Sequence, residues 1–401
     1  MLCVLIYTQT NCGLRTVIKI LDIFEGVLGG ACGKAPSYNT VSGWVRKLGL
    51  SVYEDQKPAD YKYAVIMDES IMVNREKLLL TLGIPGDHTG RAVRHSDVKV
   101  LGMQVGDVFK GEDVKNEIAR ISDEIGAEPD YAISDEGHNL VSGIASAGIS
   151  HHHDISHALG NCMKRVYGKD SEFMELTTKL GKIRLQYHLT DKAWLLPPNM
   201  RSIARFMNLD KWVDWASRML GCHDSLDDKM KDAYAFLLDY RELIGELDVC
   251  IKAIRHLEDV CKNRGFSKES CEDCMRYVIR NVIGNANNRR ATLGLRLLDY
   301  FKRERSVLGK TETARNISSD IIESDFGIFK AKQSPNKLYG MTSLVLMLPL
   351  YPKIIDYSVS KEQDFKERLA NVKLKDVDLW AKENLSQNWV ATRIKTLTKA
   401  S

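Results

Sequence analysis

The stretch YAVIMDES, residues 63–70, decides the expected fold. Apolar side chains run without a break up to Asp68, which is typical of a buried strand. A carboxylate that closes such a strand needs water, a cation or a metal ion as a partner, because burying an unpaired charge is costly. Taken alone, an Asp in this position more commonly begins a turn. The stretch predicts a strand over 61–68 with an acid at its end.

The apolar pattern also predicts the elements that follow. Runs over 71–83 and 96–106 have short connections, which favours an antiparallel meander of three strands. The pattern then alternates, with a helix over 111–125, a strand over 129–135, a helix over 139–147, a strand over 149–153 and a helix over 155–166. We therefore expect an α/β fold with a mixed sheet and flanking helices. The order βββαβαβα is that of the ribonuclease-H-like fold.

Two further acids stand in comparable contexts. Asp135 closes the strand in DYAISDEG (130–137), and Glu323 lies near the start of a helix in DIIESDFGIFKAK (320–332). Magnesium takes oxygen ligands and few protein carboxylates, which leaves room for water and phosphate. Two metals about 3.5–4 Å apart can clamp both oxygens of an in-line displacement at phosphorus. Asp68, Asp135 and Glu323 are therefore the candidate metal ligands and catalytic residues.

Asp154, in HHHDISHALGN (151–161), is an alternative to Asp135 because it also ends a strand. It has a structural role available, since an Asp before Ile155 can cap the helix that begins there. His157 could reach the scissile phosphate or hydrogen-bond a carboxylate, or it could be a half-buried helix histidine. Asp154 and His157 are taken as supporting residues.

The string around Glu323, Ile-Glu-Ser followed by an aromatic residue and a lysine, resembles the DDE transposases of bacterial insertion sequences. These enzymes have a ribonuclease-H-like catalytic core. The resemblance implies Mg²⁺ as cofactor, with Mn²⁺ as an expected substitute. It implies double-stranded DNA as the partner, at the element ends and at the target, and a homodimer because two ends must be joined. A helical insertion before the catalytic Glu is known in this family.

Lysines follow Glu323 on the same predicted helix. Positions 323, 326 and 330 share one face by their i, i+3, i+7 spacing. Lys330 is expected to contact DNA phosphates, and Lys332 is a second candidate. Basic residues are frequent over 281–340, although a charge run alone is usually a solvated face.

The first 60 residues predict a small helical module. A helix over 13–28, a glycine-rich turn and a helix over 38–48 that stops at Gly49 have the layout of a helix-turn-helix. In that motif the start of the second helix faces base edges. The candidate DNA-binding residues are Ser37, Asn39 and Thr40 for bases, and Arg46 and Lys47 for phosphates. An ordinary helical hairpin is the alternative. We expect fuller relatives to carry sequence before Met1.

The remaining segments complete the expected organisation. A strand-free stretch contains Trp194, Trp212 and Trp215, of which core packing should take at least two. Cys261, Cys271, Cys274 and His256 have poor zinc-site spacing. The expected domains are a helix-turn-helix-like module (1–60), the core's first part (61–167), the helical insertion (168–315), the core's final part (316–360) and a charged helical tail with Trp380 and Trp389 (361–401).

Composition is compatible with this organisation. The 401 residues are 44% hydrophobic and 27% charged, with a formal net charge of +4. A weak charge bias neither requires nor excludes a nucleic-acid partner. Nine cysteines without a disulfide framework suit a reducing bacterial cytoplasm. The apolar run over 341–355 is too short and proline-broken to be a membrane span. Two other functions stay open: a nuclease of the same fold without strand transfer, and a non-catalytic transposase-derived DNA-binding protein.

Overall fold

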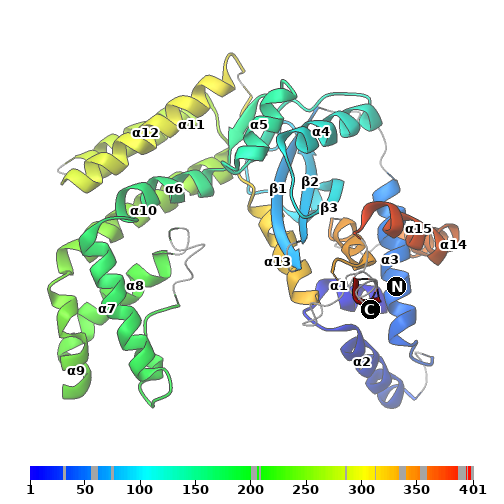
Figure 1. Cartoon of the computed structure of the whole chain (residues 1–401), viewed down its shortest axis with the longest axis horizontal. Coiled ribbons are helices and arrows are strands. Elements are labelled where there is room, and N and C mark those ends of the chain that lie inside the picture. The colour runs from blue at the N-terminus through cyan, green and yellow to red at the C-terminus, as the bar shows by residue number, and fades with distance from the viewer. Residues whose placement is uncertain are drawn as a thin grey trace. The chain divides into compact units, whose positions relative to one another are not determined.

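The computed structural model describes residues 1–29, 33–55, 62–73, 76–199, 206, 209–284, 287–311, 313–333, 340–352, 359–386, 394 and 396–398. The chain divides into two units with separate cores (Figure 1). The first, which we call the sheet unit, comprises residues 1–88, 93–152 and 319–401. The second, the helical unit, comprises residues 89–92 and 153–318.

A five-stranded mixed sheet forms the centre of the sheet unit. Its strands are β1 (Tyr63–Val73), β2 (Glu76–Pro85), β3 (Lys99–Gly106), β4 (Ala132–Ser134) and β5 (His151–His153). They lie in the order β3-β2-β1-β4-β5. The first three pair antiparallel, as the sequence predicted, and β4 pairs parallel to β1. The predicted α/β class is therefore confirmed.

The first hairpin differs from the prediction in its register. The second strand was expected to begin at Ile71, but Ile71 belongs to β1 and pairs with Lys77 of β2. Residues on both sides of the turn suit strands, and the segment has no Gly or Pro to mark the turn. Asp68 consequently lies inside β1, opposite Leu80, and not at the end of the strand.

Helices cover both faces of the sheet. On one face lie α4 (Gly111–Ile125) and α5 (His138–Ser146), which share a core with Val65 and Met67 of β1. On the other face, Ala64 and Ile66 share a core with α13 (Asp320–Lys332) and the 3₁₀ helix η7 (Ser343–Leu350). The alternation of β1 side chains between two apolar cores explains its uninterrupted apolar sequence.

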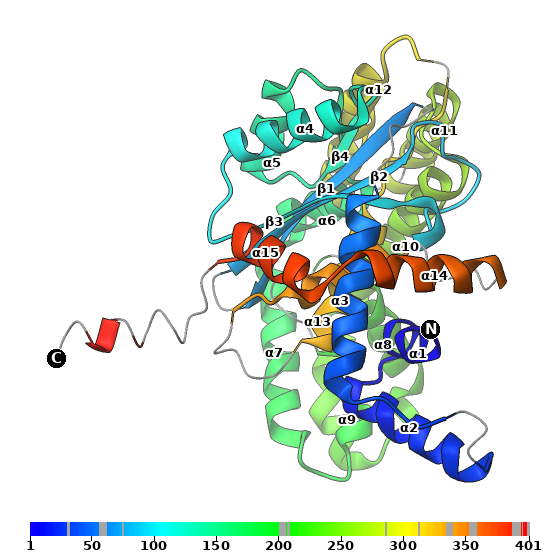
Figure 2. The ribbon, with the colours of Figure 1, turned by 90° about the vertical axis from the view of Figure 1, so that its right-hand side faces the viewer.

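The N-terminal helices and the tail also belong to this second core. These elements are α1 (Leu2–Gln9), α2 (Leu14–Val27), α3 (Tyr38–Glu54), α14 (Val359–Asn371) and α15 (Leu374–Asn384). Figure 2 shows α14 and α15 crossing α3, and Trp380 packs edge-on to Tyr53 with ring centroids 6.3 Å apart. Modules expected over 1–60 and 361–401 are thus parts of one unit with the sheet. Trp389 lies outside the described residues.

Helix α3 begins where predicted and ends later. Ser37 caps it by accepting a hydrogen bond from the Thr40 N–H at 3.1 Å. The helix continues through Gly49, which had been taken as its stop, to Glu54. A Cβ atom at Gly49 would lie 1.8 Å from the Leu346 carbonyl oxygen. Glycine is needed here for the close approach of η7, and not to end the helix.

The helical unit is an array of helices around one core. Its main helices are α6 (Ile155–Tyr167), α7 (Ser171–Tyr187), α8 (Leu209–Cys222), α9 (Asp228–Tyr234), α10 (Arg241–Arg264), α11 (Lys268–Val278) and α12 (Asn288–Leu308). Among its described residues the only β pairing outside named strands is the isolated bridge Phe266–Arg315, which agrees with a strand-free stretch. The expected boundary at 167/168 moves to 152/153, because α6 buries Leu159, Met163 and Tyr167 in this core.

Within the described part of the chain, no helix has the length and apolar character needed to cross a membrane. The most apolar stretch forms η7, whose side chains are buried in the sheet unit. Core packing therefore accounts for its hydrophobicity.

Candidate active site

Asp68 lies in β1, and Asp135 directly follows β4, the strand that pairs parallel to β1. In the register of β1 and β4, Val65 lies beside Ala132 and Ile66 beside Ile133. Asp68 comes two residues after Ile66 in β1, and Asp135 comes two residues after Ile133, directly past the end of β4. Adjacent strands are about 4.8 Å apart, so the two backbones present their aspartates side by side. Both side chains are half-buried.

The two aspartates face the side of the sheet that α13 covers. Ile66 and Ile133 pack in the same core as Ile322 and Phe326 of α13. Because strand side chains alternate, Asp68 and Asp135 share the face of these two isoleucines. Figure 1 shows α13 beside β1, and the two elements are in contact. Glu323, in the first turn of α13, is exposed next to this face.

Lys330 connects α13 to the strand that carries Asp68. Its Nζ donates a hydrogen bond to Ser70 Oγ at 2.5 Å, and Ser70 lies two residues beyond Asp68 on the same face. Partial burial lowers the pKa of Lys330, and the negative charges of Asp68 and Glu323 oppose this shift. Asp68, Glu323 and Lys330 are therefore coupled electrostatically.

The turn after β4 orients Asp135. Its Oδ1 accepts the Gly137 N–H at 2.8 Å, and a Cβ at Gly137 would lie only 2.8 Å from that oxygen. Ser134 Oγ donates to the Asp135 carbonyl at 2.9 Å and lies 2.8 Å from His151 Nε2. Asp68 Oδ1 similarly accepts the Glu69 N–H at 2.7 Å. The backbone therefore holds one oxygen of each aspartate.

The donor set fits magnesium in part. Two adjacent carboxylates suit Mg²⁺, which often binds one or two carboxylates and completes its shell with water and phosphate oxygens. Among the described residues, however, no group of three or more His, Cys, Asp or Glu side chains is arranged to hold a metal ion. Asp68 and Asp135 are thus the residues that could hold the metal, while Glu323 does not complete a three-ligand site in this arrangement.

A buried polar cluster lies on the same helix and was not predicted. Asp325 is fully buried, and its Oδ1 lies 3.1 Å from His95 Nδ1 of η1 (His95–Asp97), in a geometry that is not a hydrogen bond. Burial raises the pKa of Asp325, and His95 opposes this shift. Neither Asp325 oxygen nor the Tyr351 hydroxyl has a hydrogen-bond partner. An acid between Ile322 and Phe329 on the apolar stripe was the available sequence signal.

Asp154 and His157 belong to the helical unit. Asp154 is buried, and its Oδ1 accepts the His157 N–H at 2.7 Å, which caps α6. The expected capping role is therefore confirmed. His157 is half-buried in the first turn of α6.

The candidate DNA-binding residues of the N-terminal module separate into two groups. Ser37, Asn39 and Thr40 are exposed at the start of α3. Arg46 donates to the Ser42 carbonyl at 3.2 Å and to Ser343 Oγ at 3.4 Å, and Lys47 donates to the Leu369 carbonyl. These two cations bind their own chain, which holds α3 against η7 and α14.

Lys332 is also engaged internally. Its ammonium donates to the carbonyl oxygens of Tyr7, Thr10 and Cys12 at the end of α1. A cation at a helix C-terminus compensates the helix dipole. Of the two lysines on α13, Lys330 is the one beside the candidate site.

The aromatic and sulfur residues of the helical unit are largely structural. Trp212 is buried, and Trp215 is half-buried and donates to the Leu195 carbonyl at 3.1 Å, so the expected core role of two tryptophans is confirmed. Trp194 is 78% exposed. Cys261, Cys271 and Cys274 are buried in the core, while His256 stacks on Tyr277 with ring centroids 3.9 Å apart.

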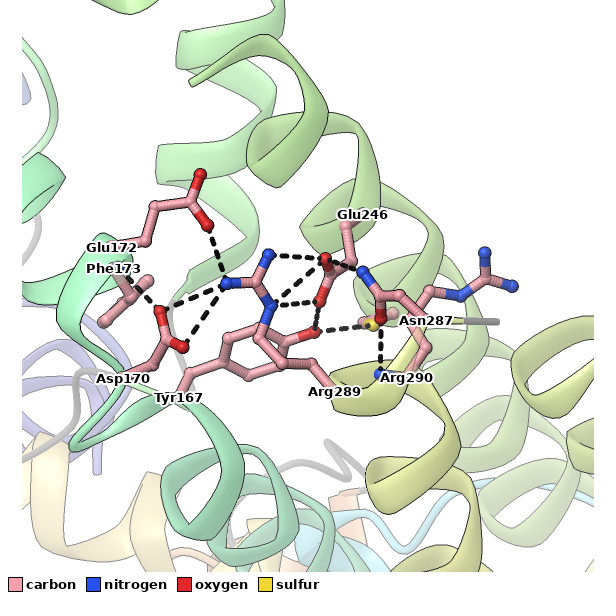
Figure 3. A network of polar contacts seen from close by, with 9 residues as sticks. Tyr167, Asp170, Glu172, Phe173, Glu246, Asn287, Arg289 and Arg290 are labelled. Atoms are coloured by element: carbon pink, nitrogen blue, oxygen red, sulfur yellow. Dashed lines mark hydrogen bonds and ion pairs between the residues drawn. The ribbon is translucent and has the colours of Figure 1, made fainter. Parts of the chain in front are cut away.

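The basic residues around 281–340 form internal ion pairs at several positions. Arg289 contacts the carboxylates of Asp170, Glu172 and Glu246 (Figure 3). Arg303 pairs with Glu304 at 3.1 Å, and Arg305 pairs with Glu272 at 2.9 Å. Part of the local excess of positive charge is therefore neutralised by ion pairs within the helical unit.

No protein-family model matches this chain, and no curated protein matches it. The functional assignment therefore depends on the residues and on their geometry.

Proposed function

We propose that this chain is a DDE-type transposase with a ribonuclease-H-like core, which cleaves and joins DNA at the ends of an insertion sequence. One observation carries the proposal: Asp68 in β1 and Asp135, the residue that follows β4, each come two residues after a paired isoleucine of two parallel strands, on the sheet face that the helix of Glu323 covers. The strand order β3-β2-β1-β4-β5, with three antiparallel strands followed by a parallel one, supports the ribonuclease-H-like assignment.

Asp68 and Asp135 would hold Mg²⁺, and Mn²⁺ is the expected substitute. When bound, the metal supplies charge neutralisation at phosphorus and a more acidic water. The turn that fixes Asp135 Oδ1 limits the motion of that side chain, so less ordering is needed when the DNA binds. Exposed Glu323 is the third acid on this face, and Lys330 is positioned to neutralise a phosphate there.

Double-stranded DNA is the proposed partner, at the element ends and at the target. Ser37, Asn39 and Thr40, exposed at the N-terminus of α3, are proposed to contact DNA there. Two DNA ends must be held together, so the active species is proposed to be a homodimer in the bacterial cytoplasm. Lys330 takes the role of phosphate contact, whereas Arg46, Lys47 and Lys332 bind their own chain.

The test is a strand-cleavage and joining assay on a supercoiled plasmid. The plasmid carries the DNA that flanks the reading frame on both sides, and the divalent ion is Mg²⁺ or Mn²⁺. Asp68→Asn and Asp135→Asn should each reduce cleavage by roughly 10³-fold or more, because several kcal/mol of charge stabilisation are lost and about 1.4 kcal/mol is tenfold. Binding to the same DNA in a gel shift should remain, since neither aspartate contacts phosphate directly.

The matched control is Asp123→Asn, which removes an exposed acid from α4 on the opposite face of the sheet. It should cleave and join like the wild type. Nicked plasmid without joined products would favour a nuclease of the same fold. Specific binding without any cleavage by the wild type would favour a non-catalytic DNA-binding protein.

A further inference from the structure

We propose that the Lys330 ammonium is an internal counter-cation of Asp68 and Glu323, which competes with the divalent metal until a DNA phosphate draws it away. This role rests on the proposed function. It describes how the binding of metal and the binding of DNA are linked at the same site. It also gives Lys330 two successive anionic partners, first the carboxylates of its own chain and then a phosphate.

The geometry of α13 carries this proposal. Glu323 and Lys330 are seven residues apart and therefore share a helix face. The Lys330 ammonium extends from that face to β1, where it binds Ser70 Oγ at 2.5 Å. Ser70 and Asp68 are two residues apart on one strand face, so roughly 7 Å separates their backbones. The Phe326 ring, whose centroid lies 5.8 Å from Lys330 Nζ, borders the ammonium on the helix side.

The charges around this ammonium have a consequence for metal binding. Asp68 and Glu323 are the negative charges that raise the pKa of Lys330 against the effect of burial, so the ammonium neutralises part of the charge that would attract a divalent ion. A divalent ion at Asp68 would also be repelled by the ammonium. At roughly 7 Å, the spacing of the Ser70 and Asp68 backbones, the repulsion between a single and a double positive charge in a water-like dielectric with salt screening corresponds to a threefold to roughly tenfold weaker metal affinity.

DNA changes this balance. A phosphate placed at the site offers Lys330 a second anion. When the Lys330 ammonium moves from the carboxylates to the phosphate, it no longer repels the divalent ion. Metal and DNA should therefore bind with positive coupling, and each should tighten the other by the same factor. Without DNA, the site holds the metal weakly, which limits cleavage to occasions when the substrate is in place.

The experiment is a Mn²⁺ titration followed by the electron paramagnetic resonance signal of free Mn²⁺, without DNA. Lys330→Met should bind Mn²⁺ threefold to roughly tenfold more tightly than the wild type. Lys19→Met, which removes an exposed lysine on α2, changes the net charge equally and should stay within twofold of the wild type. Lys330→Gln keeps a polar group near Ser70 without the charge and should behave like Lys330→Met.

Unchanged or weaker Mn²⁺ binding in both Lys330 variants, with folding intact by circular dichroism, would overturn the counter-cation role alone. A second titration adds a duplex oligonucleotide: the wild-type affinity for Mn²⁺ should rise, and that of Lys330→Met should rise less. Asp68→Asn removes a proposed ligand, so the Mn²⁺ that the wild type binds in excess of this variant is the Mn²⁺ bound at the proposed site. If the wild type binds no more Mn²⁺ than Asp68→Asn under any of these conditions, the proposed metal-dependent function itself fails.

Discussion

Two polar clusters, one in each unit and each built on a buried carboxylate, differ in how their charges are satisfied. In the helical unit, Arg289 lies among three carboxylates, and Figure 3 shows its guanidinium directed at Asp170, Glu172 and Glu246. In the sheet unit, Asp325 is buried beside His95, but neither of its oxygens has a hydrogen-bond partner. Native proteins usually satisfy buried polar groups, so the second cluster is the unusual one.

The Arg289 cluster has a clear structural role. Glu246 accepts hydrogen bonds from Tyr167 at 2.5 Å and from Asn287 at 2.6 Å in addition to Arg289. Asp170 Oδ1 also caps α7 by accepting the Phe173 N–H at 2.9 Å. The network therefore ties α7, α10 and α12 together through charge-assisted hydrogen bonds, which are the stronger kind.

The Asp325 cluster lies on the helix that carries Glu323 and Lys330. Buried polar groups without partners destabilise a fold, and proteins tend to retain them where function requires them. The comparison indicates that the helical unit uses its buried charges for stability. In the sheet unit, the buried Asp325 on the helix of Glu323 has an ion partner, His95, but no hydrogen bond.

The largest expected effect is in the helical unit. Arg289→Met should lower the free energy of unfolding of this unit by about 3–5 kcal/mol, because it leaves the buried Glu246 carboxylate without its cation. Urea denaturation followed by the fluorescence of Trp212 and Trp215 would measure this. Arg276→Met is the control, since its side chain is 72% exposed and its pair with Asp273 contributes little. Equal stability of the two variants would contradict the structural role of the cluster.

Glycines sharpen the comparison between the units. Gly49→Ala should destabilise the sheet unit by about 1–3 kcal/mol or more, because the new Cβ would meet the Leu346 carbonyl oxygen. Gly245→Ala in α10 is the matched variant: its Cβ would have no neighbour within 4 Å, and it should stabilise by about 0.5–1 kcal/mol. Hydrogen–deuterium exchange, read separately for each unit, tests both. A stabilising Gly49→Ala would mean that α3 and η7 do not approach each other as described.

The smallest expected effect is at Asp325. Asp325→Asn removes a buried carboxylate whose only recorded ion partner is the partly exposed His95 and whose oxygens have no hydrogen bond, so it should change the stability of the sheet unit by less than about 1 kcal/mol. The same measurement on Asp170→Asn should show a loss, because that carboxylate is paired. The contrast between the two clusters would be contradicted if Asp325→Asn lowered the free energy of unfolding as much as Arg289→Met does.

Much of the fold could be predicted from the sequence because it depends on local patterns. Strand and helix periods predicted the order of the eight elements between residues 61 and 167, and the start of the helix at Tyr38 and the cap at Asp154 were correctly expected. From the sequence, Asp68 and Asp135 were expected only as two acids that each end a strand and could bind a metal. Their register on parallel strands could not be read from the sequence, because pairing joins segments more than 60 residues apart.

The amino-acid sequence alone determined the element types, their order and the acids that close the apolar runs, because each follows from neighbouring residues. Tertiary structure decided what distant residues do. It brought the side chains of Arg46, Lys47 and Lys332 to backbone carbonyls of their own chain, contacts that the sequence pattern did not indicate. It made Gly49 a close contact in place of a helix end. It also set Lys330 beside Asp68, since the partner of a long flexible cation depends on which anions folding brings within its reach.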